Sequence, residues 1–392
     1  MLHEQDPQTH HPEFSDQTAM RTAIAHLIET NSHPRKKNIG EGNAVLEVAD
    51  GRKFLIKWST QIAPFSTTNV VTEAFKHHAV RDLLNNSIYG QNHNIKMAEI
   101  QGFELVTANG PQKQPAEFVV VMYEFLELQH LQDVITPQNS QALISELLRT
   151  LTHIHSIPLT DHVPENSLFP EYTPERYIQE VQTMIANIAT VVPERYIQKL
   201  LRIERFFTEK ELAFTPTLIH SDPATHNTGV QVQDDSHFTI IPLDSENFRK
   251  GCKHEDFARL FNQFLGVNKL RPYIWDLQLF LQENNLITDA KDRHAFLAMR
   301  VFKAIFLANH WRNVGLEPGA VKTDILEKMI TWIDRAEALV QHNQPFLDYE
   351  KALKKRRAAS IANHAIEVFF QVHGLYQTSQ RIRQLLIGRD LK

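Results

Sequence analysis

The middle of the chain holds a short stretch whose residue types and spacing could position a metal-bound phosphate beside a base. His220, Asp222 and Asn227 form the pattern H-x-D-x-x-x-x-N within LIHSDPATHN. Asp244 ends the apolar run FTIIPLD, seventeen residues after Asn227. A carboxylate can take a proton from a hydroxyl, and amide and carboxylate oxygens are hard ligands that suit Mg²⁺. The stretch therefore predicts a site for phosphoryl transfer.

A lysine and a glutamate far upstream could supply a clamp for the phosphates. Lys57 lies near the end of the strand-like run KFLIKW, and Glu73 follows sixteen residues later in a segment with helical character. An ion pair between them would hold the lysine where it can bridge nucleotide phosphates. Gly40 and Gly42 precede Lys57, and a residue without a side chain lets the backbone approach a ligand closely. We expect this first hairpin to fold over the phosphates.

The segment that carries this clamp is predicted to form a small mixed lobe. Residues 1–16 are polar and we expect a disordered tail, whereas residues 17–125 carry helix and strand patterns. Apolar residues recur at helical spacing over residues 17–29, and strand-like runs flank the turn signal Asp50-Gly51. A helix over TNVVTEAFKHHAVRDLLNN and the runs IKMAEI, GFELVTANG and AEFVVVMYEFLE complete a predicted lobe of five strands and one main helix.

The remainder of the chain is mostly helical in pattern. Strand character ends at Glu124 to Leu126, and we interpret these residues as a hinge at which Glu124 and Leu126 contact the nucleotide. Residues 126–345 are predicted to form a catalytic and acceptor-binding lobe of helices, interrupted by one hairpin that carries Asn227 and Asp244. Residues 346–392 are predicted to form a C-terminal helical extension.

The composition limits the class of protein. The chain has 392 residues, enough for two domains, and its apolar fraction of 42% and charged fraction of 22% are those of an ordinary globular protein. The net charge of −5 argues against a nucleic-acid partner. The single cysteine, Cys252, excludes an internal disulfide framework and zinc sites built on cysteine pairs, and it fits a reducing compartment.

The sequence also bears on where the protein acts. Its first residues, MLHEQDPQTHHPEFSDQ, have neither an apolar core nor a basic start, so we predict no secretory signal. No run of eighteen apolar residues occurs, so we predict no membrane span. We therefore expect a cytoplasmic protein, with export by a leaderless route as the open alternative.

The central motifs resemble those of the aminoglycoside phosphotransferase and choline kinase superfamily, which has a protein-kinase-like fold. HSDPATHN is similar to the H-G-D-x-x-x-x-N catalytic loop of that family, LDSE to its I-D-[FW]-E segment, and HEDFARL to the D-L-A segment that follows. The resemblance implies that Asp222 is the catalytic base and that Asn227 and Asp244 are Mg²⁺ ligands. It also implies structural support of the loop by Asp256, and we interpret His220 as structural too.

The resemblance extends upstream and defines the expected architecture. Lys57 and Glu73 match the lysine–glutamate pair of the family in type, spacing and setting. The resemblance implies an α+β, two-lobed fold with a small antiparallel sheet and one main helix in the N-terminal lobe, and a large, mostly helical C-terminal lobe. Ser221 departs from the pattern because the family has glycine there, and a β-carbon at that position conflicts with an unusual backbone angle.

These observations lead to one main functional hypothesis and two alternatives. We expect an ATP- and Mg²⁺-dependent kinase whose partners are a nucleotide and a small-molecule hydroxyl, such as an aminoglycoside, a choline-like amine or a sugar alcohol. Four acids could receive a cationic acceptor: Glu246, Glu255, Asp276 and Glu283. The same motifs would serve a protein kinase or a kinase-like effector, and a nucleotide-binding pseudokinase is the non-enzymatic alternative. The sequence does not predict the oligomeric state.

Overall fold

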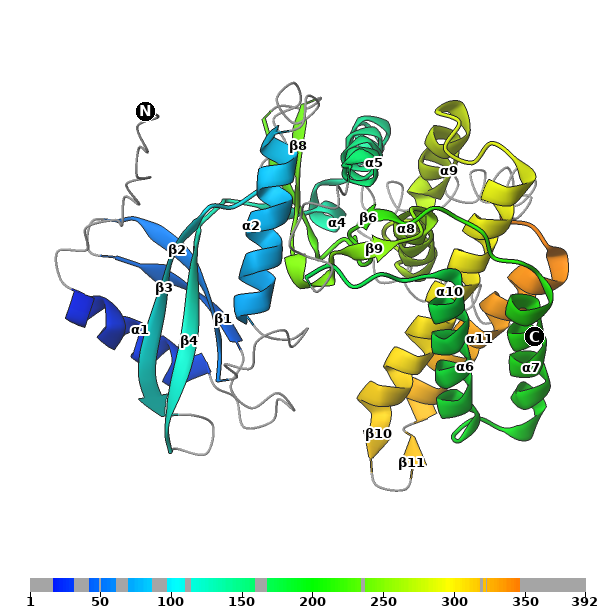
Figure 1. Cartoon of the computed structure of the whole chain (residues 1–392), viewed down its shortest axis with the longest axis horizontal. Helices are drawn as coiled ribbons and strands as arrows, with labels where there is room; N and C mark the ends of the chain where they lie inside the picture. The colour runs from blue at the N-terminus through cyan, green and yellow to red at the C-terminus, as the bar shows by residue number, and fades with distance from the viewer. Residues whose placement is uncertain are drawn as a thin grey trace, which may run out of the picture.

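The chain forms two lobes of different character (Figure 1). The computed structural model describes residues 17–31, 42–48, 51–60, 70–86, 97–109, 114–158, 168–233, 237–317, 320–321 and 323–345. The predictions for residues 1–16, Gly40 and residues 346–392 therefore lie outside the described residues. Within the described residues, a small antiparallel sheet precedes a large helical region, which confirms the predicted α+β, two-lobed class.

The N-terminal lobe is built on a four-stranded antiparallel sheet in the order β1-β2-β4-β3. Its strands are β1 (Gly42–Glu47), β2 (Lys53–Ser59), β3 (Ile100–Asn109) and β4 (Pro115–Glu124). β1 and β2 form the predicted hairpin, and Gly51 in its turn has a φ of +84°, where side chains other than glycine are disfavoured. The sheet thus presents Lys57 from its second strand.

Two helices flank this sheet. α1 (Gln17–Asn31) buries Met20, Ile24 and Ile28 against one face of the sheet, in a cluster that includes Trp58. α2 (Val70–Asn86) packs on the other side through Val70 and Ala74, beside Val121 and Tyr123 of β4. The spacing of these apolar residues along each helix places them on one face, so burial selects the side on which each helix docks.

The structure corrects one predicted strand. Of the segment 95–100, Met97 to Glu99 form no strand, and Ile100 begins β3. A single backbone bond, from Glu124 N to Glu99 O at 2.7 Å, ties the segment to the sheet. Met97 is buried in the core of the C-terminal lobe, so the chain leaves the sheet to reach that core. Among the described residues, the sheet of the N-terminal lobe has four strands where five were expected.

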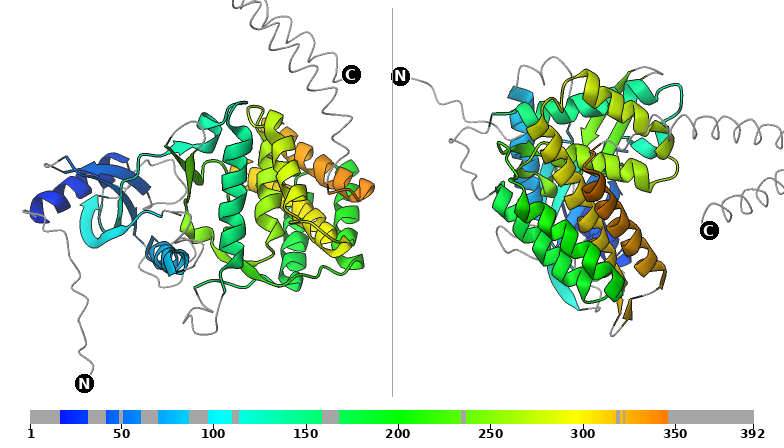
Figure 2. Two further views of the ribbon diagram at one scale, coloured as in Figure 1. Left: turned by 90° about the horizontal axis from the view of Figure 1, so that it is seen from above. Right: turned by 90° about the vertical axis from the view of Figure 1, so that its right-hand side faces the viewer.

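The C-terminal lobe is mostly helical, as predicted. Its longer helices are α5 (Ser140–Ser156), α6 (Pro174–Ala189), α7 (Glu194–Glu209), α8 (His254–Gly266), α9 (Ile274–Glu283), α10 (Ala290–Gly315) and α11 (Thr323–His342). α10 contacts α6, α8 and α11, and Figure 2 shows α6 and α7, in green, beside α10 and α11, in yellow and orange. α10 therefore lies at the centre of the lobe.

Short strands carry the predicted site residues into this helical lobe. β6 (Thr217–Ile219) pairs antiparallel with β9 (Arg249–Gly251), and β7 (Thr228–Val232) pairs with both β8 (Phe238–Pro242) and β5 (Gln129–His130). The β7–β8 hairpin is the predicted one. β5 and β9 are additional, because two or three residues carry no alternation that a sequence pattern could reveal. A further short pair, β10 (Leu316–Glu317) and β11 (Ala320–Val321), follows α10.

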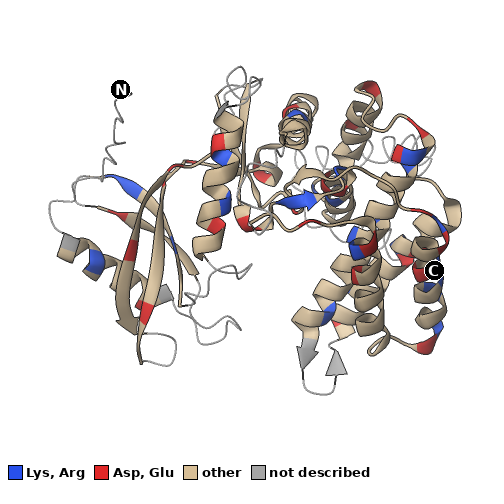
Figure 3. Cartoon of the chain, viewed as in Figure 1, with Lys and Arg blue, Asp and Glu red and all other residues tan. Residues whose placement is uncertain are grey.

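Charged residues are interspersed over both lobes in the described part of the chain (Figure 3). No helix among the described residues is long and apolar enough to cross a membrane.

A buried charge cluster joins the elements around α8. Glu255, on α8, is 0% exposed and accepts hydrogen bonds from Tyr177 of α6, from Arg249 Nη2 of β9 at 2.6 Å and from Lys303 of α10. Burial raises the pKa of Glu255, but the Arg249 and Lys303 cations outweigh burial and lower it to about 2. The carboxylate is therefore ionised at neutral pH and anchors three other elements to α8.

We expect Glu255→Gln to lower the free energy of unfolding by about 3–5 kcal/mol, because it leaves two buried cations without their anion. Urea denaturation at pH 7 measures this loss. Glu283→Gln, at an exposed position on α9, is the matched control and should change stability by less than about 0.5 kcal/mol. Equal stabilities for the two variants would contradict the role given to Glu255.

Candidate active site

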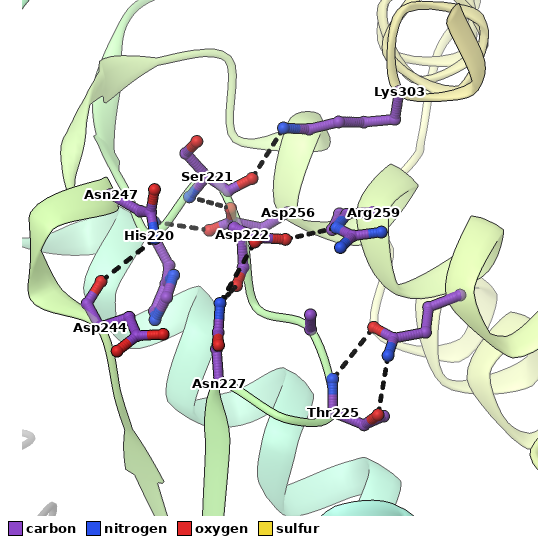
Figure 4. Close-up of polar contacts among 12 residues, drawn as sticks. His220, Ser221, Asp222, Thr225, Asn227, Asp244, Asn247, Asp256, Arg259 and Lys303 are labelled. Atoms are coloured by element: carbon purple, nitrogen blue, oxygen red, sulfur yellow. Dashed lines mark hydrogen bonds and ion pairs between the residues drawn. The ribbon is translucent and has the colours of Figure 1, made fainter. Parts of the chain in front are cut away.

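The loop between β6 and β7, residues 220–227, carries His220, Asp222 and Asn227 (Figure 4). His220 Nε2 donates to Leu243 O at 2.7 Å, and Leu243 N donates to Asn227 O at 2.9 Å. Since Leu243 directly precedes Asp244, these two bonds tie the loop to the segment that carries the second predicted acid. The structure therefore brings together the three motif residues, from the loop between β6 and β7, and Asp244, which follows β8.

Asp222 is held at both carboxylate oxygens. Arg259 Nε, from α8, donates to Oδ1, and Asn227 Nδ2 donates to Oδ2 at 3.2 Å. Burial raises the pKa of Asp222, but the Arg259 and Lys303 cations outweigh burial and hold the pKa below its ordinary value. Asp222 is therefore an ionised carboxylate at neutral pH, which is the state that can take a proton from a hydroxyl.

Asp244 lies just beyond β8, with a φ of 53° in the left-handed region that aspartate tolerates better than most residues. Its side chain is 41% exposed, whereas Asn227 is buried beside it. Among the described residues, no group of three or more His, Cys, Asp or Glu side chains is arranged to hold a metal ion alone. Mg²⁺ commonly uses one or two protein ligands and completes its shell with substrate phosphates and water, so Asn227 and Asp244 fit that mode.

Lys57 connects the two lobes. Its Nζ lies 2.6 Å from Glu73 Oε1, on α2, and 3.1 Å from Asp244 Oδ1. Burial lowers the pKa of Lys57, but the Glu73 and Asp244 carboxylates more than offset burial and raise the pKa above its ordinary value. The lysine is therefore charged, and the predicted Lys57–Glu73 pair is formed across sixteen residues of sequence. A phosphate that contacts Lys57 would also lie close to Asp244.

The remaining residues predicted at the nucleotide site lie in β1, at the end of β4 and in the connection that follows β4. Gly42 begins β1 opposite Trp58, and a Cβ built on Gly42 would lie 2.4 Å from the Trp58 ring, so packing within the lobe already requires glycine there. Glu124 ends β4, and its side chain accepts from Glu99 N at 3.4 Å. Leu126 follows in the connection to the C-terminal lobe and is half-buried. Gly40 lies outside the described residues.

Asp256 braces the loop from α8. It is 0% exposed, and its two oxygens accept from His220 N at 3.0 Å and from Ser221 N at 2.6 Å. His155 Nε2, from the end of α5, lies 2.9 Å from the same carboxylate. Three polar groups thus converge on one buried acid.

Ser221 takes a backbone angle that usually requires glycine. Its φ is 69°, in the left-handed region. Its N–H is bound by Asp256, and its carbonyl accepts from Lys303 Nζ at 2.8 Å. Both peptide groups are therefore fixed, and the loop holds this conformation despite the β-carbon.

The N-terminal lobe reaches the site at a second place. His77 of α2 lies with Nδ1 2.8 Å from Ser245 Oγ and Nε2 2.6 Å from Ala98 O, and Lys76 Nζ donates to Glu246 O at 2.6 Å. Since Ala98 O can only accept, Nε2 carries the proton and Nδ1 accepts from Ser245, which describes a neutral imidazole. Burial lowers the pKa of His77 to about 4, consistent with that state.

Sequence reasoning missed several residues that contact the motif. Arg259, Lys303 and His77 lie on three different helices. Arg259 lies within HEDFARL but beyond the D-L-A pattern that this segment resembles, and Lys303 and His77 belong to no quoted motif. Arg259 alone has a usable sequence signal, because it follows Asp256 by three residues on a helix and must share its face. Lys303 and His77 have no such signal.

Comparison with known proteins adds the class of fold. Neither a family model nor a curated protein sequence matches the chain. A solved structure of the amicoumacin kinase hAmiN in complex with AMP-PNP, Ca²⁺ and Ami matches with a TM-score of 0.55 at 12% identity, covering 86% of this chain and 97% of that one. The GDP complex of wild-type aminoglycoside 2'-phosphotransferase-IIIa matches with a TM-score of 0.53 at 12% identity, covering 82% and 98%.

The chain therefore has the fold of the aminoglycoside phosphotransferases, and the predicted resemblance is confirmed at the level of architecture. Another similar structure is an aminoglycoside phosphotransferase in complex with GDP and kanamycin, with a TM-score of 0.50 at 13% identity. The nucleotides and the antibiotic in these structures belong to those proteins.

We expect Ser221→Gly to raise the free energy of unfolding by about 1 kcal/mol, because glycine occupies positive φ without a steric cost. Chemical denaturation measures the change. Asn285→Gly is the matched control: Asn285 also has a positive φ, of 52°, but asparagine tolerates this region, so its gain should be smaller. A destabilised Ser221→Gly variant would show that the loop is not strained at this residue.

The buried neutral His77 predicts a stability that depends on pH. Its folded pKa, about 4, lies below the unfolded value of 6.5, so the unfolded chain binds more protons between these values. The stabilisation is complete above pH 6.5 and is lost as pH falls towards 4. Between pH 7 and pH 5, urea denaturation should show wild type losing about 2 kcal/mol relative to His77→Gln. His78→Gln, at an exposed neighbour, should track wild type.

Proposed function

We propose that this chain is an ATP- and Mg²⁺-dependent phosphotransferase that moves the γ-phosphate of the nucleotide to a hydroxyl of a small molecule. The observation that supports this most directly is the meeting of two lobes at one carboxylate. Lys57 of β2 contacts both Glu73 and Asp244, and Asp244 adjoins the loop that holds Asp222 and Asn227. The proposal is supported because residues that could serve as a phosphate clamp, as two oxygen ligands and as a base lie in one place.

On the nucleotide side, Lys57 would bind the phosphates, and Glu73 would keep the lysine from turning away. Asn227 and Asp244 would hold Mg²⁺, which neutralises charge on the phosphates when bound. The 41% exposure of the Asp244 side chain supports its assignment, because a metal ion bound there could also contact phosphates and water. Gly40, Gly42, Glu124 and Leu126 remain proposed contacts of the nucleotide.

On the acceptor side, Asp222 would orient the hydroxyl and take its proton. The acceptor oxygen forms a bond to the γ-phosphorus, the bond from that phosphorus to the bridging oxygen breaks, and ADP leaves with the electron pair. The proton passes from the hydroxyl to Asp222. Because phosphoryl transfer needs mainly positioning, a carboxylate with a lowered pKa can serve this role.

The class of acceptor is less closely defined than the reaction. A cationic acceptor such as an aminoglycoside requires accessible acids, and kanamycin is present in one similar structure. Of the four acids considered from the sequence, Glu255 is unsuitable because it is fully buried in its own ion pairs. Asp276 accepts from Ser140 Oγ at 2.7 Å, so part of its capacity is already used. Glu246 and Glu283 remain candidates.

The compartment we propose is the cytoplasm, which supplies ATP and keeps thiols reduced. Cys252 is a buried free thiol, in keeping with that environment.

We expect Asp222→Asn to lower kcat by about 10²- to 10⁴-fold while the KM for ATP changes little, because the amide cannot accept the proton. Release of ADP in the presence of a panel of aminoglycosides, amino alcohols and sugar alcohols measures this, with and without Mg²⁺. Asp133→Asn, at an exposed acid of the short helix α4 (Leu131–Val134), is the matched control and should behave as wild type. An Asp222→Asn variant as active as wild type would exclude Asp222 as the base.

The same panel separates the alternatives. Transfer to a protein but to no small hydroxyl would identify a protein kinase, and ATP binding without turnover in wild type would identify a pseudokinase. Asp244→Asn should weaken Mg²⁺-dependent nucleotide binding, measured by calorimetry, more than Asp222→Asn does. Equal and intact binding in both variants would exclude the metal assignment.

A further inference from the structure

One face of α8 contacts the whole length of the loop. Asp256, Arg259 and Gln263 are spaced by three and four residues, which places them on one side of a helix. Asp256 accepts from the backbone at the start of the loop, and Gln263 Oε1 accepts from Thr225 N at 3.0 Å near its end. Gln263 Nε2 also donates to Thr225 Oγ1 at 2.7 Å. The loop is thus aligned along α8 at both ends (Figure 4).

Arg259 makes the middle contact, and it differs in kind from the other two. Its Nε donates to Oδ1 of the Asp222 side chain, whereas Asp256 and Gln263 accept from backbone N–H groups of the loop, and the one loop side chain that Gln263 binds is that of Thr225. The backbone on either side of Asp222 is therefore already braced without Arg259. What Arg259 adds is a restraint on the carboxylate itself.

The restraint is directional. The last torsion of an aspartate is broad, so a carboxylate without partners samples many orientations. Here Oδ1 receives Arg259 and Oδ2 receives Asn227 Nδ2 at 3.2 Å, so both ends of the group are fixed. The Arg259 side chain is itself 10% exposed and rises from a packed helix, so it has little freedom of its own. A charge-assisted bond to a planar guanidinium is also strong and geometrically specific.

We propose that Arg259 is a positioning residue for phosphoryl transfer, which fixes the plane of the Asp222 carboxylate towards the acceptor hydroxyl through its Nε. This inference rests on the proposed function of Asp222 as the base. It assigns to Arg259 an effect on the chemical step and none on nucleotide binding, because Arg259 bonds to Oδ1 of Asp222, whereas Asn227 bonds to Oδ2 and Lys57 contacts Asp244. Misplacing a reacting group by about 1 Å can cost a factor of about 10² in rate.

The test compares Arg259→Ala with Arg271→Ala. Arg271 also lies in the C-terminal lobe and donates to a backbone carbonyl, Leu265 O, at 3.0 Å, but it does not touch the motif. We expect Arg259→Ala to lower kcat by about 10²-fold with the KM for ATP within about twofold of wild type. Arg271→Ala should leave kcat unchanged. Arg259→Lys keeps the charge without the planar donors, so its kcat should lie between those of wild type and Arg259→Ala.

Chemical rescue provides the readout that a purely structural role would not move. Millimolar guanidinium should raise the kcat of Arg259→Ala at least tenfold and should leave wild type and Arg271→Ala unchanged. Loss of activity that follows the fraction of unfolded protein, with no response to guanidinium, would overturn the inference, as would full activity of Arg259→Ala. If wild type transfers phosphate and Asp222→Asn does not, either of these results for Arg259→Ala refutes the role of Arg259 and leaves the proposed function intact. An inactive wild type would refute the proposed function and this inference together.

Discussion

The geometry of the motif depends on one buried carboxylate. Asp256 receives the backbone N–H groups of His220 and Ser221 and contacts His155, all inside the C-terminal lobe. Hydrogen bonds to a fully buried carboxyl group are costly to break, because they would leave buried polar groups without partners. The acid can therefore hold Ser221 at positive φ against a steric cost of about 1–2 kcal/mol. Asp222 follows directly and is aimed by the turn that results.

A second constraint lies where the two lobes meet, at residues 244–246. Lys57 contacts Asp244, His77 contacts Ser245, and Lys76 donates to the carbonyl of the next residue along the chain. β2 and α2 of the N-terminal lobe thus hold three successive residues of the C-terminal lobe by directional polar bonds. Because Asp244 is among them, the phosphate clamp and the proposed metal ligand are positioned by the same contacts. A displacement of α2 would therefore disturb both.

How much of the fold could be predicted depended on the separation in sequence between the residues that interact. The α+β class, the β7–β8 hairpin and the long helices follow from local periodicity, which burial enforces on each element. The supposed strand at 95–100 failed because Met97 packs into a distant core, which alternation does not encode. β5 and β9 went unpredicted because very short strands exist only through partners far along the chain.

The sequence by itself determined which groups are available. Asp222, Asn227 and Asp244 are spaced as a loop and a following strand would require, and Lys57 is followed by Glu73 in the next helix. It also indicated where the backbone departs from the usual pattern, at Ser221. Only the tertiary structure decided which charges meet. Arg259 reaches Asp222 and Lys303 reaches Ser221 because α8 and α10 pack side by side, and Lys57 reaches Asp244 because the lobes close on each other. Ion pairs act over a few ångströms whatever the separation in sequence, so their partners are set by packing.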